Sequence, residues 1–386
     1  MYKIKTYNKI SKIGLEAFDD KYTVGDEVEN ADGAIVRSAA LHDEEFPASL
    51  KAIARAGAGT NNIPIDRCSE QGIVVFNTPG ANANAVKELV IAGLLLSSRK
   101  IPAAMDWIKT LKGKGDEVGK LVEKGKSQFV GPEIMGKKLG VIGLGAIGIL
   151  VANAAAELGM DVYGADPFLS VENALKLSGK VHYVKSNKEI FEKCDYITLH
   201  VPALPDTKGM INAEAIASMK KTVRLLNFAR DTLVDEKAII DALANGGMAC
   251  YVTDFATDGL IGLDGVVAMP HLGASTPESE DNCAVMAVRE ITDYIENGNI
   301  RNSVNLPNVE MAISGNAKIC VIHKNAEGLL NNITAPVSAA GLNIENMVSK
   351  SKKDYAYTCL DVKGDTTGIE AAIKAVAGVV SVRVIK

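Results

Sequence analysis

Short apolar segments and longer amphipathic segments alternate along residues 1–100, and this alternation predicts strands and helices. Three segments are apolar and end in small or turn-forming residues, as buried strands do: Asp32–Arg37, Leu50–Ala56 and Ile73–Asn77. Ala85–Ser97 is apolar on nearly every side, which predicts a helix buried on several faces. The lysine- and glycine-rich stretch Lys109–Lys126 is expected to form a solvated helix and loop.

The alternation restarts more regularly after Lys138. Further strand-like segments are separated by stretches of helical length: Leu139–Ile142, Met160–Ala165, Tyr196–His200, Val223–Asn227, Ala249–Phe255 and Gly265–Ala268. Strands interleaved with helices in this way form a doubly wound parallel sheet. Ser275–Asn297 then predicts a long helix, because Ser-Thr-Pro-Glu at its start supplies an N-cap residue and a proline in the first turn.

Residues 316–386 follow a different order. The segments there are a strand at Lys318–His323, a helix at Gly328–Ala340, strands at Leu342–Ser349 and Tyr355–Val362, a helix at Gly368–Ala377 and a strand at Val380–Ile385. This βαββαβ order is that of a ferredoxin-like domain. Pro336 falls inside the first of the two helices, where a proline is expected to bend or break it.

Composition narrows the class of protein. With 386 residues the chain is long enough for two or three domains of roughly 100–200 residues each. Hydrophobic residues make up 47% and charged residues 23%, a balance that fits a globular protein and excludes a disordered or fibrous one. The formal charge of −5 argues against a general binder of nucleic acid or of anionic membranes.

Nothing in the sequence predicts a membrane span or a secretion signal. The longest apolar runs, Leu89–Leu96 and Val376–Val380, fall well short of the ~20 residues that a transmembrane helix needs. Met1–Lys5 leads into no signal-peptide core. The six cysteines have no metal-binding spacing and are expected to be reduced, which predicts a cytoplasmic protein without a metal site.

A glycine motif follows the predicted strand Leu139–Ile142 and opens a predicted helix, Ile147–Leu158. The motif is Gly143-Leu144-Gly145-Ala146-Ile147-Gly148. In this pattern the first glycine permits a tight turn, the second lets a pyrophosphate approach the backbone, and the third lets the helix pack close to the strand. The helix N-terminus then favours the phosphates. Asp166 ends the next strand, where a carboxylate accepts hydrogen bonds from ribose hydroxyls and repels a 2′-phosphate. The motif therefore predicts a site for NAD rather than for NADP.

Three predicted strand ends carry reactive side chains, at His200, at Arg230 and at His271. Because ligands bind at the carboxyl ends of the strands in such a sheet, these side chains are the candidates for catalysis. Histidine is the best proton acceptor near neutral pH, and arginine is the best cation for holding a carboxylate through two hydrogen bonds. We predict that His271 is the general acid–base and that His200 is scaffold beside the cofactor. His42 and His182 lie in polar stretches and are expected at the surface.

Together these segments resemble the D-2-hydroxyacid dehydrogenase family over essentially the whole chain. The matching stretches are residues 56–63 (AGAGTNNI), 77–96, 136–148 (GKKLGVIGLGAIG), 200–211 (HVPALPDTKGMI), 225–230 (LLNFAR) and 269–276 (MPHLGAST). The resemblance implies an α/β fold with two Rossmann-like doubly wound parallel-sheet domains plus the C-terminal ferredoxin-like βαββαβ domain. It implies a discontinuous substrate-binding domain at residues 1–98 and 280–310, an NAD-binding Rossmann domain at 99–279 and the C-terminal domain at 316–386.

The resemblance also assigns roles to single residues. Arg230 would bind the substrate carboxylate and polarise the C2 oxygen, and His271 would accept the C2 hydroxyl proton while a hydride passes to the nicotinamide. Backbone N–H groups around Ala58-Gly59 would help to bind the carboxylate, and Arg37-Ser38 is similar to the segment that meets a substrate phosphate. The residues implied at the NAD site are Gly143, Gly145, Ala146, Ile147, Gly148, Asp166, His200, Val201, Pro202, Thr207, Asn227, Ala229, Asp254 and Gly273.

The acid that pairs with His271 is where the sequence departs from the family. Relatives usually have a glutamate in a D-V-F-x-x-E-P stretch, whereas residues 253–259 here read TDFATDG. Aligned on Phe255, Asp258 takes the glutamate position. We predict Asp258 as the partner of His271 and place Asp254 near the nicotinamide, with Asp254 as the alternative partner. Asp231 stands where relatives usually have glycine, and it adds a negative charge beside the substrate carboxylate.

The C-terminal unit resembles an ACT domain, which is a regulatory module. Its stretches 321–330 (VIHKNAEGLL) and 340–347 (AGLNIENM) keep His323, Asn325 and Asn343 at positions that bind the feedback inhibitor L-serine in relatives. Ala326-Glu327 replaces the usual Arg-Pro, a departure that bears on serine sensing. The resemblance implies a homodimer or homotetramer, a small phosphorylated 2-hydroxyacid as substrate and L-serine as an effector, with no nucleic-acid or membrane partner.

Two alternative functions stay open at this point. The chain could be a dehydrogenase or reductase for another D-2-hydroxyacid, such as glycerate, lactate or 2-hydroxyglutarate. The family also contains transcriptional corepressors, so a non-catalytic NAD-sensing protein is the alternative from a different class. The ACT-like unit and the lack of disordered extensions favour an enzyme.

Overall fold

The structure, a computed structural model, describes all 386 residues. Contacts within the chain divide it into two compact units: unit 1 comprises residues 1–82 and 277–386, and unit 2 comprises residues 83–276. The chain thus passes between the units at 82/83 and at 276/277, whereas the sequence places these boundaries at 98/99 and 279/280. The first difference arises because the helix that begins at Ala83 packs on the sheet of unit 2.

Unit 1 contains a five-stranded parallel sheet in the order β2-β1-β3-β4-β5. Its strands are β1 (Tyr2–Tyr7), β2 (Tyr22–Gly25), β3 (Gly33–Val36), β4 (Ala52–Arg55) and β5 (Val74–Asn77), and its helices are α1 (Lys12–Leu15), α2 (Ile65–Gln71) and α11 (Pro277–Asn297). Strands β3 to β5 confirm the three strands predicted in this region. The sequence does not predict β1, because lysines alternate with its buried residues, Ile4 and Thr6: Lys3 is exposed and Lys5 is half-buried.

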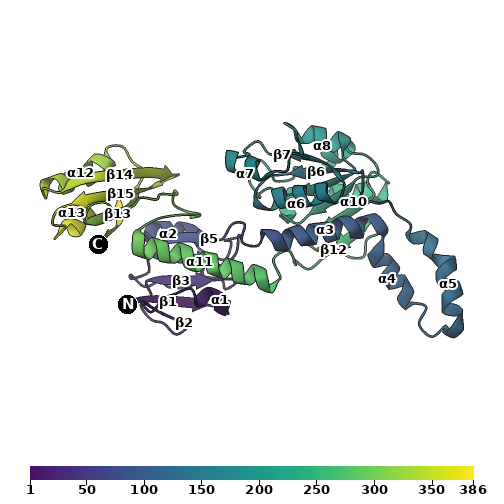
Figure 1. Ribbon diagram of the computed structural model, residues 1–386, viewed down its shortest axis with the longest axis horizontal. Helices are drawn as coiled ribbons and strands as arrows, with labels where there is room; N and C mark the ends of the chain where they lie inside the picture. Colours follow the sequence, from purple (N-terminus) through teal and green to yellow (C-terminus); the bar gives the residue numbers. More distant parts are fainter. The chain divides into compact units, whose positions relative to one another are not determined.

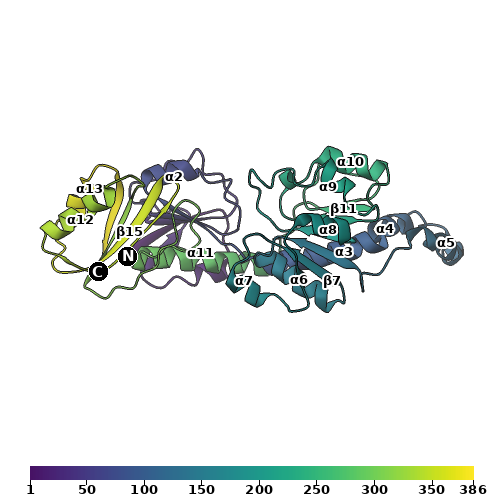
Figure 2. The same cartoon turned by 90° about the horizontal axis from the view of Figure 1, so that it is seen from above.

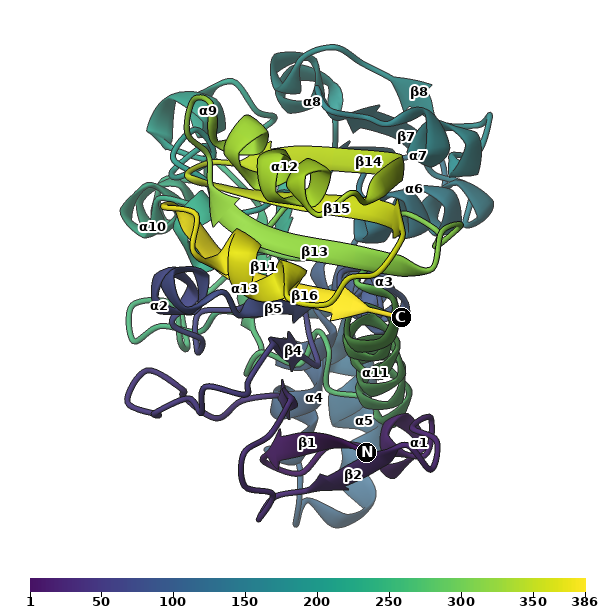
Figure 3. The ribbon, with the colours of Figure 1, turned by 90° about the vertical axis from the view of Figure 1, so that its left-hand side faces the viewer.

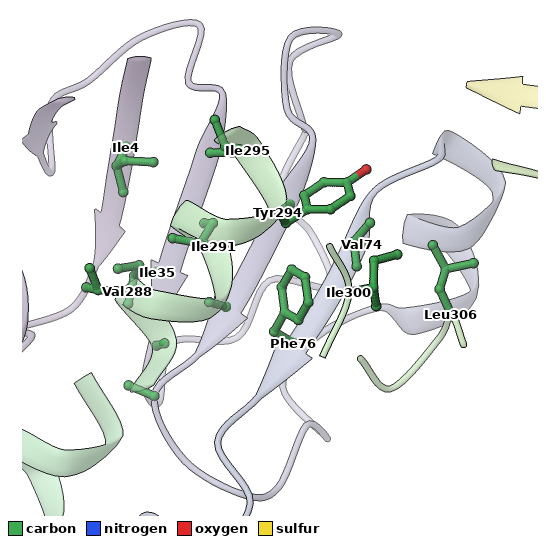
Figure 4. Close-up of a cluster of buried hydrophobic side chains, with 14 of the residues drawn as sticks. Ile4, Ile35, Val74, Phe76, Val288, Ile291, Tyr294, Ile295, Ile300 and Leu306 are labelled. Atoms are coloured by element: carbon green, nitrogen blue, oxygen red, sulfur yellow. The ribbon is translucent and has the colours of Figure 1, made fainter. Parts of the chain in front are cut away.

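Helix α11 forms the centre of the unit 1 core. Its apolar face carries Val288, Ile291 and Ile295, which pack against β1 and β3 (Figure 4). Tyr294 of the same helix lies beside Phe76 of β5, with ring centroids 5.9 Å apart. Burying one aliphatic side chain such as Ile291 stabilises the folded state by ~1.5–3 kcal/mol. This one helix therefore anchors the N-terminal sheet to a segment far along the chain.

The C-terminal part of unit 1 is an antiparallel sheet in the order β14-β15-β13-β16. Its elements confirm the predicted βαββαβ order: β13 (Ala317–Lys324), α12 (Leu329–Ala339), β14 (Asn343–Lys352), β15 (Tyr355–Lys363), α13 (Ile369–Lys374) and β16 (Val379–Ile385). The two helices cover one face of the sheet (Figure 3). Ile333 and Val337 of α12, with Ile369 and Ile373 of α13, form a separate core against that face.

The opposite face of this sheet packs against the end of α11. Tyr357 of β15 belongs to the same buried cluster as Tyr294, and its hydroxyl donates to the carbonyl of Gly298 at 2.7 Å. Lys318 of β13 is fully buried and donates to three oxygen atoms, among them the Asn297 carbonyl at 2.7 Å. The positive charge of a lysine at the C-terminal end of a helix also interacts favourably with the partial negative charge of the helix dipole there. The C-terminal sheet thus shares a core with the N-terminal part of the chain.

Helix α12 continues through Pro336, so of the bend or break expected there the break does not occur. The helix runs from Leu329 to Ala339 with Pro336 inside it. Proline has no N–H, so the carbonyl of Asn332, four residues earlier, loses its helical partner. Asn332 is exposed, and water can donate to that carbonyl instead. The buried Ile333 and Val337 hold the helix on the sheet on either side of the proline.

Unit 2 is built around a seven-stranded parallel sheet in the order β12-β11-β10-β9-β6-β7-β8. The strands are β6 (Lys138–Ile142), β7 (Asp161–Ala165), β8 (His182–Tyr183), β9 (Tyr196–Leu199), β10 (Arg224–Asn227), β11 (Cys250–Thr253) and β12 (Val266–Ala268). They confirm the predicted doubly wound sheet and add the short β8. The strand order reverses between β6 and β9, and ligands of such sheets bind in the crevice at that point.

Helices cover both faces of this sheet (Figure 2). The helices α3 (Ala83–Arg99) and α6 (Ala146–Glu157) pack on one face, and α8 (Asn187–Lys193), α9 (Ala213–Ala217) and α10 (Glu236–Ala244) pack on the other. The short α7 (Val171–Lys176) follows β7. The sheet is therefore buried on both sides, which explains the continuous apolar runs of its strands.

Between α3 and β6 the chain forms a projecting segment. It contains α4 (Ile101–Lys109), η1 (Gly115–Glu117), α5 (Val118–Gly125) and η2 (Lys126–Phe129), and in Figure 1 α4 and α5 extend away from the sheet of unit 2. No residue of α4 or α5 is buried. This agrees with the solvated helix and loop expected there. None of the helices in the protein combines the length and hydrophobicity that crossing a bilayer requires.

Candidate active site

The glycine motif forms the turn between β6 and α6. Gly143 has a φ of +94°, and a Cβ on it would lie 2.5 Å from the carbonyl oxygen of His200. A Cβ on Gly148 would lie 1.9 Å from the carbonyl oxygen of Gly143. Gly145 differs, because a Cβ on it would meet no atom within 4 Å. Packing within the protein thus requires Gly143 and Gly148 to be glycines. Gly145 instead faces open space that a pyrophosphate can enter.

Asp166 follows β7, and its carboxylate holds the glycine turn. Its Oδ2 accepts the N–H of Leu144 and its Oδ1 accepts the N–H of Phe168, each at 2.8 Å. Helix α6 begins at Ala146, and the N–H groups of its first turn have no partner within the helix. An open glycine, free helix N–H groups and a fixed carboxylate fit the pyrophosphate and the adenosine ribose of NAD.

Substituting Gly145 with alanine should weaken NAD binding without destabilising the protein. The backbone there is extended, with φ −77° and ψ −164°, so alanine adopts it without strain. The new methyl group meets no protein atom but occupies space that the pyrophosphate needs. Forcing a methyl group into a packed contact costs ~1–3 kcal/mol, so the Kd for NAD should rise ~5- to 150-fold.

Isothermal titration calorimetry measures this Kd, and thermal denaturation measures the Tm. Gly179→Ala is the matched control, because a Cβ on Gly179 also meets no atom within 4 Å. The control should bind NAD as the wild type does. An unchanged Kd in Gly145→Ala would show that the pyrophosphate does not approach this residue.

The loop after β9 carries His200 as a neutral side chain. Burial lowers the pKa of His200 to about 3, and its Nε2 lies 3.0 Å from the hydroxyl of Thr198. Thr207 closes the same loop, because its hydroxyl donates to the carbonyl of Pro202 at 2.6 Å and accepts the N–H of Leu204 at 2.8 Å. An imidazole that stays neutral near pH 7 is poorly suited to proton transfer, which favours the scaffold role.

Arg230 projects from the turn after β10, and Asn227 shapes that turn. The fully buried Asn227 donates from Nδ2 to the carbonyl of Arg230 at 2.8 Å and accepts the N–H of Ala229 at 3.2 Å. Arg230 is exposed, and its guanidinium donates one hydrogen bond, from Nη1 to the Ala229 carbonyl at 2.6 Å. Most of its five donors are therefore available to a carboxylate. Asp231 follows at the start of η3 (Asp231–Leu233) and is also exposed.

His271 lies on the loop after β12, and Asp254 holds that loop. His271 has a φ of +54°, and its N–H donates to the carbonyl of Asp254 at 3.1 Å. The Asp254 carboxylate is buried and accepts the N–H groups of Leu272 at 2.7 Å and of Gly273 at 2.8 Å. The His271 side chain is exposed and meets the Phe255 ring edge-on, with ring centroids 5.1 Å apart. The loop therefore presents the imidazole to solvent from a fixed backbone.

Neither candidate acid is paired with His271 in this structure. Asp258 is exposed in the turn at 258–260, and no hydrogen bond or ion pair joins it to the imidazole. Both carboxylate oxygens of Asp254 are occupied by the loop N–H groups. The assignment of Asp258 as the partner of His271 stays a prediction.

The residues implied for phosphate binding lie at the carboxyl end of β3 in unit 1. Arg37 forms an ion pair with Glu280 of α11, with 2.7 Å between Nη2 and Oε1. The N–H of Ser38 donates to the side-chain oxygen of Asn8 at 3.2 Å, which orients the segment that follows Arg37. Arg37 is therefore positioned at a strand end, and its charge is compensated by an acidic side chain.

Ala58 and Gly59 follow β4 in a turn that leaves their N–H groups free. The carbonyl of Ala58 accepts from the side chain of Asn77 at 2.6 Å, and the carbonyl of Gly57 accepts the N–H of Thr78 at 3.1 Å. Neither N–H of Ala58 or Gly59 has a hydrogen-bond partner in the protein. Successive free N–H groups of this kind can bind a carboxylate.

The three residues implied for serine binding lie in the C-terminal part of unit 1. His323 is buried, with Nδ1 donating to the carbonyl of Lys324 and Nε2 accepting from the hydroxyl of Thr358, each at 2.8 Å. Burial lowers the pKa of His323, which keeps the ring neutral. Asn325 and Asn343 are exposed. The hydrogen-bonding capacity of His323 is thus used within the sheet, whereas the two asparagines are accessible.

Sequence reasoning misses Glu280, Asn8 and the loop-holding role of Asp254. An acidic residue in the first turn of a helix is common for electrostatic reasons, so Glu280 carries no signal of its pairing with Arg37. Asn8 follows a strand that the sequence does not predict. Asp254 is close in sequence to the expected acid, but only the fold shows that its carboxylate binds the His271 loop.

Comparisons with known proteins show which family the chain resembles. The family model described as "D-isomer specific 2-hydroxyacid dehydrogenase, NAD binding domain" matches residues 91–273. The D-3-phosphoglycerate dehydrogenase of Bacillus subtilis is 32% identical over 379 residues, covering 92% of this chain and 69% of that protein. The D-3-phosphoglycerate dehydrogenase of Escherichia coli K12 is 33% identical over 341 residues, covering 85% and 79%. An NAD⁺-bound 3-phosphoglycerate dehydrogenase structure from Entamoeba histolytica is 30% identical, with a TM-score of 0.62 over 79% of this chain and 98% of that one.

The doubly wound sheet, the glycine turn and the carboxylate after β7 define an NAD-binding oxidoreductase. More particularly, this chain belongs to the D-2-hydroxyacid dehydrogenase family, and NAD is its cofactor.

Proposed function

We propose that this chain oxidises D-3-phosphoglycerate to 3-phosphohydroxypyruvate, the first step of L-serine biosynthesis. The observation that carries the proposal is the pair of strand-end loops in unit 2. One presents the exposed guanidinium of Arg230, most of whose donors are unused, and the other presents the exposed imidazole of His271. The relatives of that name at 32% and 33% identity support the choice of substrate.

Each of these residues has one task in the proposed reaction. Arg230 binds the substrate carboxylate through two hydrogen bonds, assisted by the free N–H groups of Ala58-Gly59. His271 accepts the proton of the C2 hydroxyl, and Asp258 is the proposed partner of the imidazolium that forms, with Asp254 as the alternative. The glycine turn at 143–148 and Asp166 would hold NAD, which would supply the hydride acceptor for C2. Asn227 and Asp254 fix the loops that carry the arginine and the histidine, so little ordering is needed at the moment of reaction.

Arg37 is the proposed binding residue for the substrate phosphate. Its ion pair with Glu280 lies near the surface, where the side chains are 40% and 42% exposed. Such exposed pairs contribute only ~0–1 kcal/mol. A phosphate group, with more charge and three acceptor oxygens, can therefore take the place of Glu280 on the guanidinium.

Arg37→Ala should raise the KM for D-3-phosphoglycerate by ~10-fold or more, because a hydrogen bond to a charged group contributes ~1.5–3 kcal/mol. The KM for D-glycerate, which lacks the phosphate, should change little. Steady-state formation of NADH measures both. Glu280→Gln is the companion variant, since it frees Arg37 and should not raise either KM. Equal losses for both substrates in Arg37→Ala would contradict the phosphate assignment.

An unphosphorylated D-2-hydroxyacid is the second candidate substrate, and the same ion pair favours it. Because Glu280 already compensates Arg37, an acid such as D-glycerate, D-lactate or D-2-hydroxyglutarate would bind without disturbing this pair. The kcat/KM values for these three acids and for D-3-phosphoglycerate decide between the candidates. A higher value for any of the three would overturn the phosphoglycerate proposal and leave the family unchanged.

We also propose that L-serine binds the ACT-like unit and that the chain is a cytoplasmic homodimer or homotetramer. The exposed Asn325 and Asn343 support a serine site, and the six buried, free cysteines support a reducing compartment. The exposed apolar side chains on α4 and in the segment that leads into β6 support self-association: Met105, Ile108, Val130 and Met135. The activity assay is repeated with L-serine in excess, and undiminished activity would leave the ACT-like unit a structural one.

A further inference from the structure

Unit 1 contains a cavity of about 680 Å³ that no residue assigned to NAD or substrate binding lines. It lies along the middle of α11, between Gly80-Ala81 after β5 and the segment 299–302 after α11. Val285 and Met286 give it an apolar side. Its volume is in the range of small-molecule sites, ~300–1,000 Å³, and is far larger than a single ion or water molecule needs.

Glu290 of α11 lines this cavity and carries a buried oxygen without a partner. The residue is 7% exposed, and its Oε1 accepts from the side chain of Asn302 at 2.7 Å, whereas its Oε2 has no hydrogen bond. Loss of hydration raises the pKa of Glu290 to about 8, so the carboxyl group is mostly neutral at pH 7. A buried polar atom left without a partner is costly, and few occur in native proteins.

Two other charged side chains that line the cavity, Asp293 and Arg289, form no ion pair. Asp293, one turn further along α11, accepts from two asparagine side chains at 2.9 and 3.0 Å and forms no ion pair. Arg289 is exposed and has neither a hydrogen bond nor an ion pair. Arg301 is occupied by its ion pair with Glu310, and Gly80-Ala81 carries no charge. The cavity thus offers two carboxyl groups and one guanidinium that form no ion pair, with the charge of Arg301 acting on Asp293.

We propose that this cavity binds a small organic zwitterion, with its ammonium group at Glu290 and Asp293 and its carboxylate at Arg289. The ammonium group supplies the donor that Glu290 Oε2 lacks, and its charge stabilises the ionised carboxylate. The guanidinium of Arg289 offers parallel donors to a carboxylate. None of the three residues has a role in the proposed reaction, so the site stands or falls independently of it.

Calorimetry on the full chain tests the proposal with β-alanine, 4-aminobutyrate and 5-aminovalerate, which bracket the separation between the two charged ends. n-Butylamine and butyrate are the matched probes, because each keeps only one charged end. We expect at least one zwitterion to bind with one site per chain and both single-charge probes to bind ~10-fold or more weakly, as a lost hydrogen bond to a charged group predicts. Absence of binding by all three zwitterions, or equal binding by n-butylamine, would overturn the proposal.

Substitutions tie the binding to this cavity. Glu290→Gln keeps the size of the side chain and can still accept from Asn302, but it cannot ionise, and it should weaken binding ~10-fold or more. Arg289→Gln should weaken binding by a similar factor. Glu278→Gln, at the exposed start of the same helix, is the matched control and should bind as the wild type does. Wild-type affinity in Glu290→Gln would show that the probe binds elsewhere.

The titration of Glu290 gives a readout that needs no ligand. Its pKa in the folded protein, about 8, lies above the ordinary value of 4.5, so the folded state holds an extra proton between these pH values. The free energy of unfolding should therefore fall as pH rises through this window, and Glu290→Gln should lack that contribution. Asp293, Arg289 and Arg301 are common to both proteins, so the difference reports Glu290.

The Tm of Glu290→Gln relative to the wild type should accordingly be higher at about pH 8.5 than at about pH 5. Binding of the zwitterion at pH 7 should release protons from the wild type and none from Glu290→Gln, which calorimetry in buffers of different ionisation enthalpy measures. A Tm difference that does not change with pH, together with no proton release, would contradict a neutral, unpartnered Glu290.

Discussion

Replacing His271 with asparagine should lower the kcat for NADH formation by ~10²–10⁴, the usual contribution of a positioned general acid–base. Asparagine suits the test because His271 has a φ of +54°, a left-handed conformation that asparagine adopts more readily than most residues. The loop should keep its shape, because the Asp254 carboxylate binds the backbone of the next two residues and not the imidazole. The Kd for NAD, measured by calorimetry, should therefore stay unchanged.

A His271→Asn enzyme with nearly wild-type kcat would refute the assigned role. Two further variants separate the candidate acids. A carboxylate beside an imidazole favours its protonated form, so removal of the true partner should move the acidic limb of the pH–rate profile to lower pH. We expect this shift in Asp258→Asn. Asp254→Asn should instead lower the Tm, because the carboxylate accepts two backbone N–H groups through two oxygens and an amide has only one oxygen.

Arg230→Ala should lower the kcat/KM for the 2-hydroxyacid by ~30-fold to several thousandfold. Removing one partner of a hydrogen-bonded charge pair costs ~2–5 kcal/mol, which converts to this range. The turn itself should survive, because Asn227 binds the backbone carbonyl of Arg230 and not its side chain. Steady-state kinetics with saturating NAD measures the loss, and the unchanged Kd for NAD shows that unit 2 remains folded.

Arg230→Lys is the conservative variant for the same position. Lysine keeps the positive charge but lacks the planar pair of donors, so it should recover only part of the lost kcat/KM. A full recovery would mean that charge alone is needed. An Arg230→Ala enzyme with wild-type kcat/KM would place the substrate carboxylate elsewhere, for example at the free N–H groups of Ala58 and Gly59.

The elements that the sequence predicts best are those with purely local causes. The strands of unit 2 are buried on both faces, so each is a continuous apolar run between turn residues. The need for Gly148 is equally local, because a Cβ there would meet the carbonyl oxygen of Gly143, whereas Gly143 is also required by the carbonyl of His200 on a distant loop. The short β2 and the half-exposed β1 have weaker hydrophobic patterns, so the sequence does not predict them. Pro336 shows the reverse case, in which packing of α12 on its sheet outweighs a local preference.

The contacts that could not be predicted join residues far apart in the sequence. The pair Arg37–Glu280 depends on α11 returning to the sheet of unit 1. The hydrogen bonds from the N–H groups of Leu272 and Gly273 to the Asp254 carboxylate depend on β11 and β12 ending at the same edge of the sheet. Nothing in the sequence distinguishes Glu290 from an ordinary helix residue. Only its burial by the surrounding segments raises the pKa of its carboxyl group. In each case the chemistry depends on the tertiary neighbours.

The C-terminal sheet is not an appendage that could be cut away. A chain that ended before residue 316 would uncover Tyr294, now 1% exposed, and would leave the Asn297 carbonyl without the buried Lys318. Both changes fall on α11, the helix around which the N-terminal sheet is built. A domain joined only by a flexible linker can be lost while the remainder still folds. The C-terminal sheet instead contributes buried side chains to the core around α11. We therefore expect truncation at that junction to destabilise the core around α11.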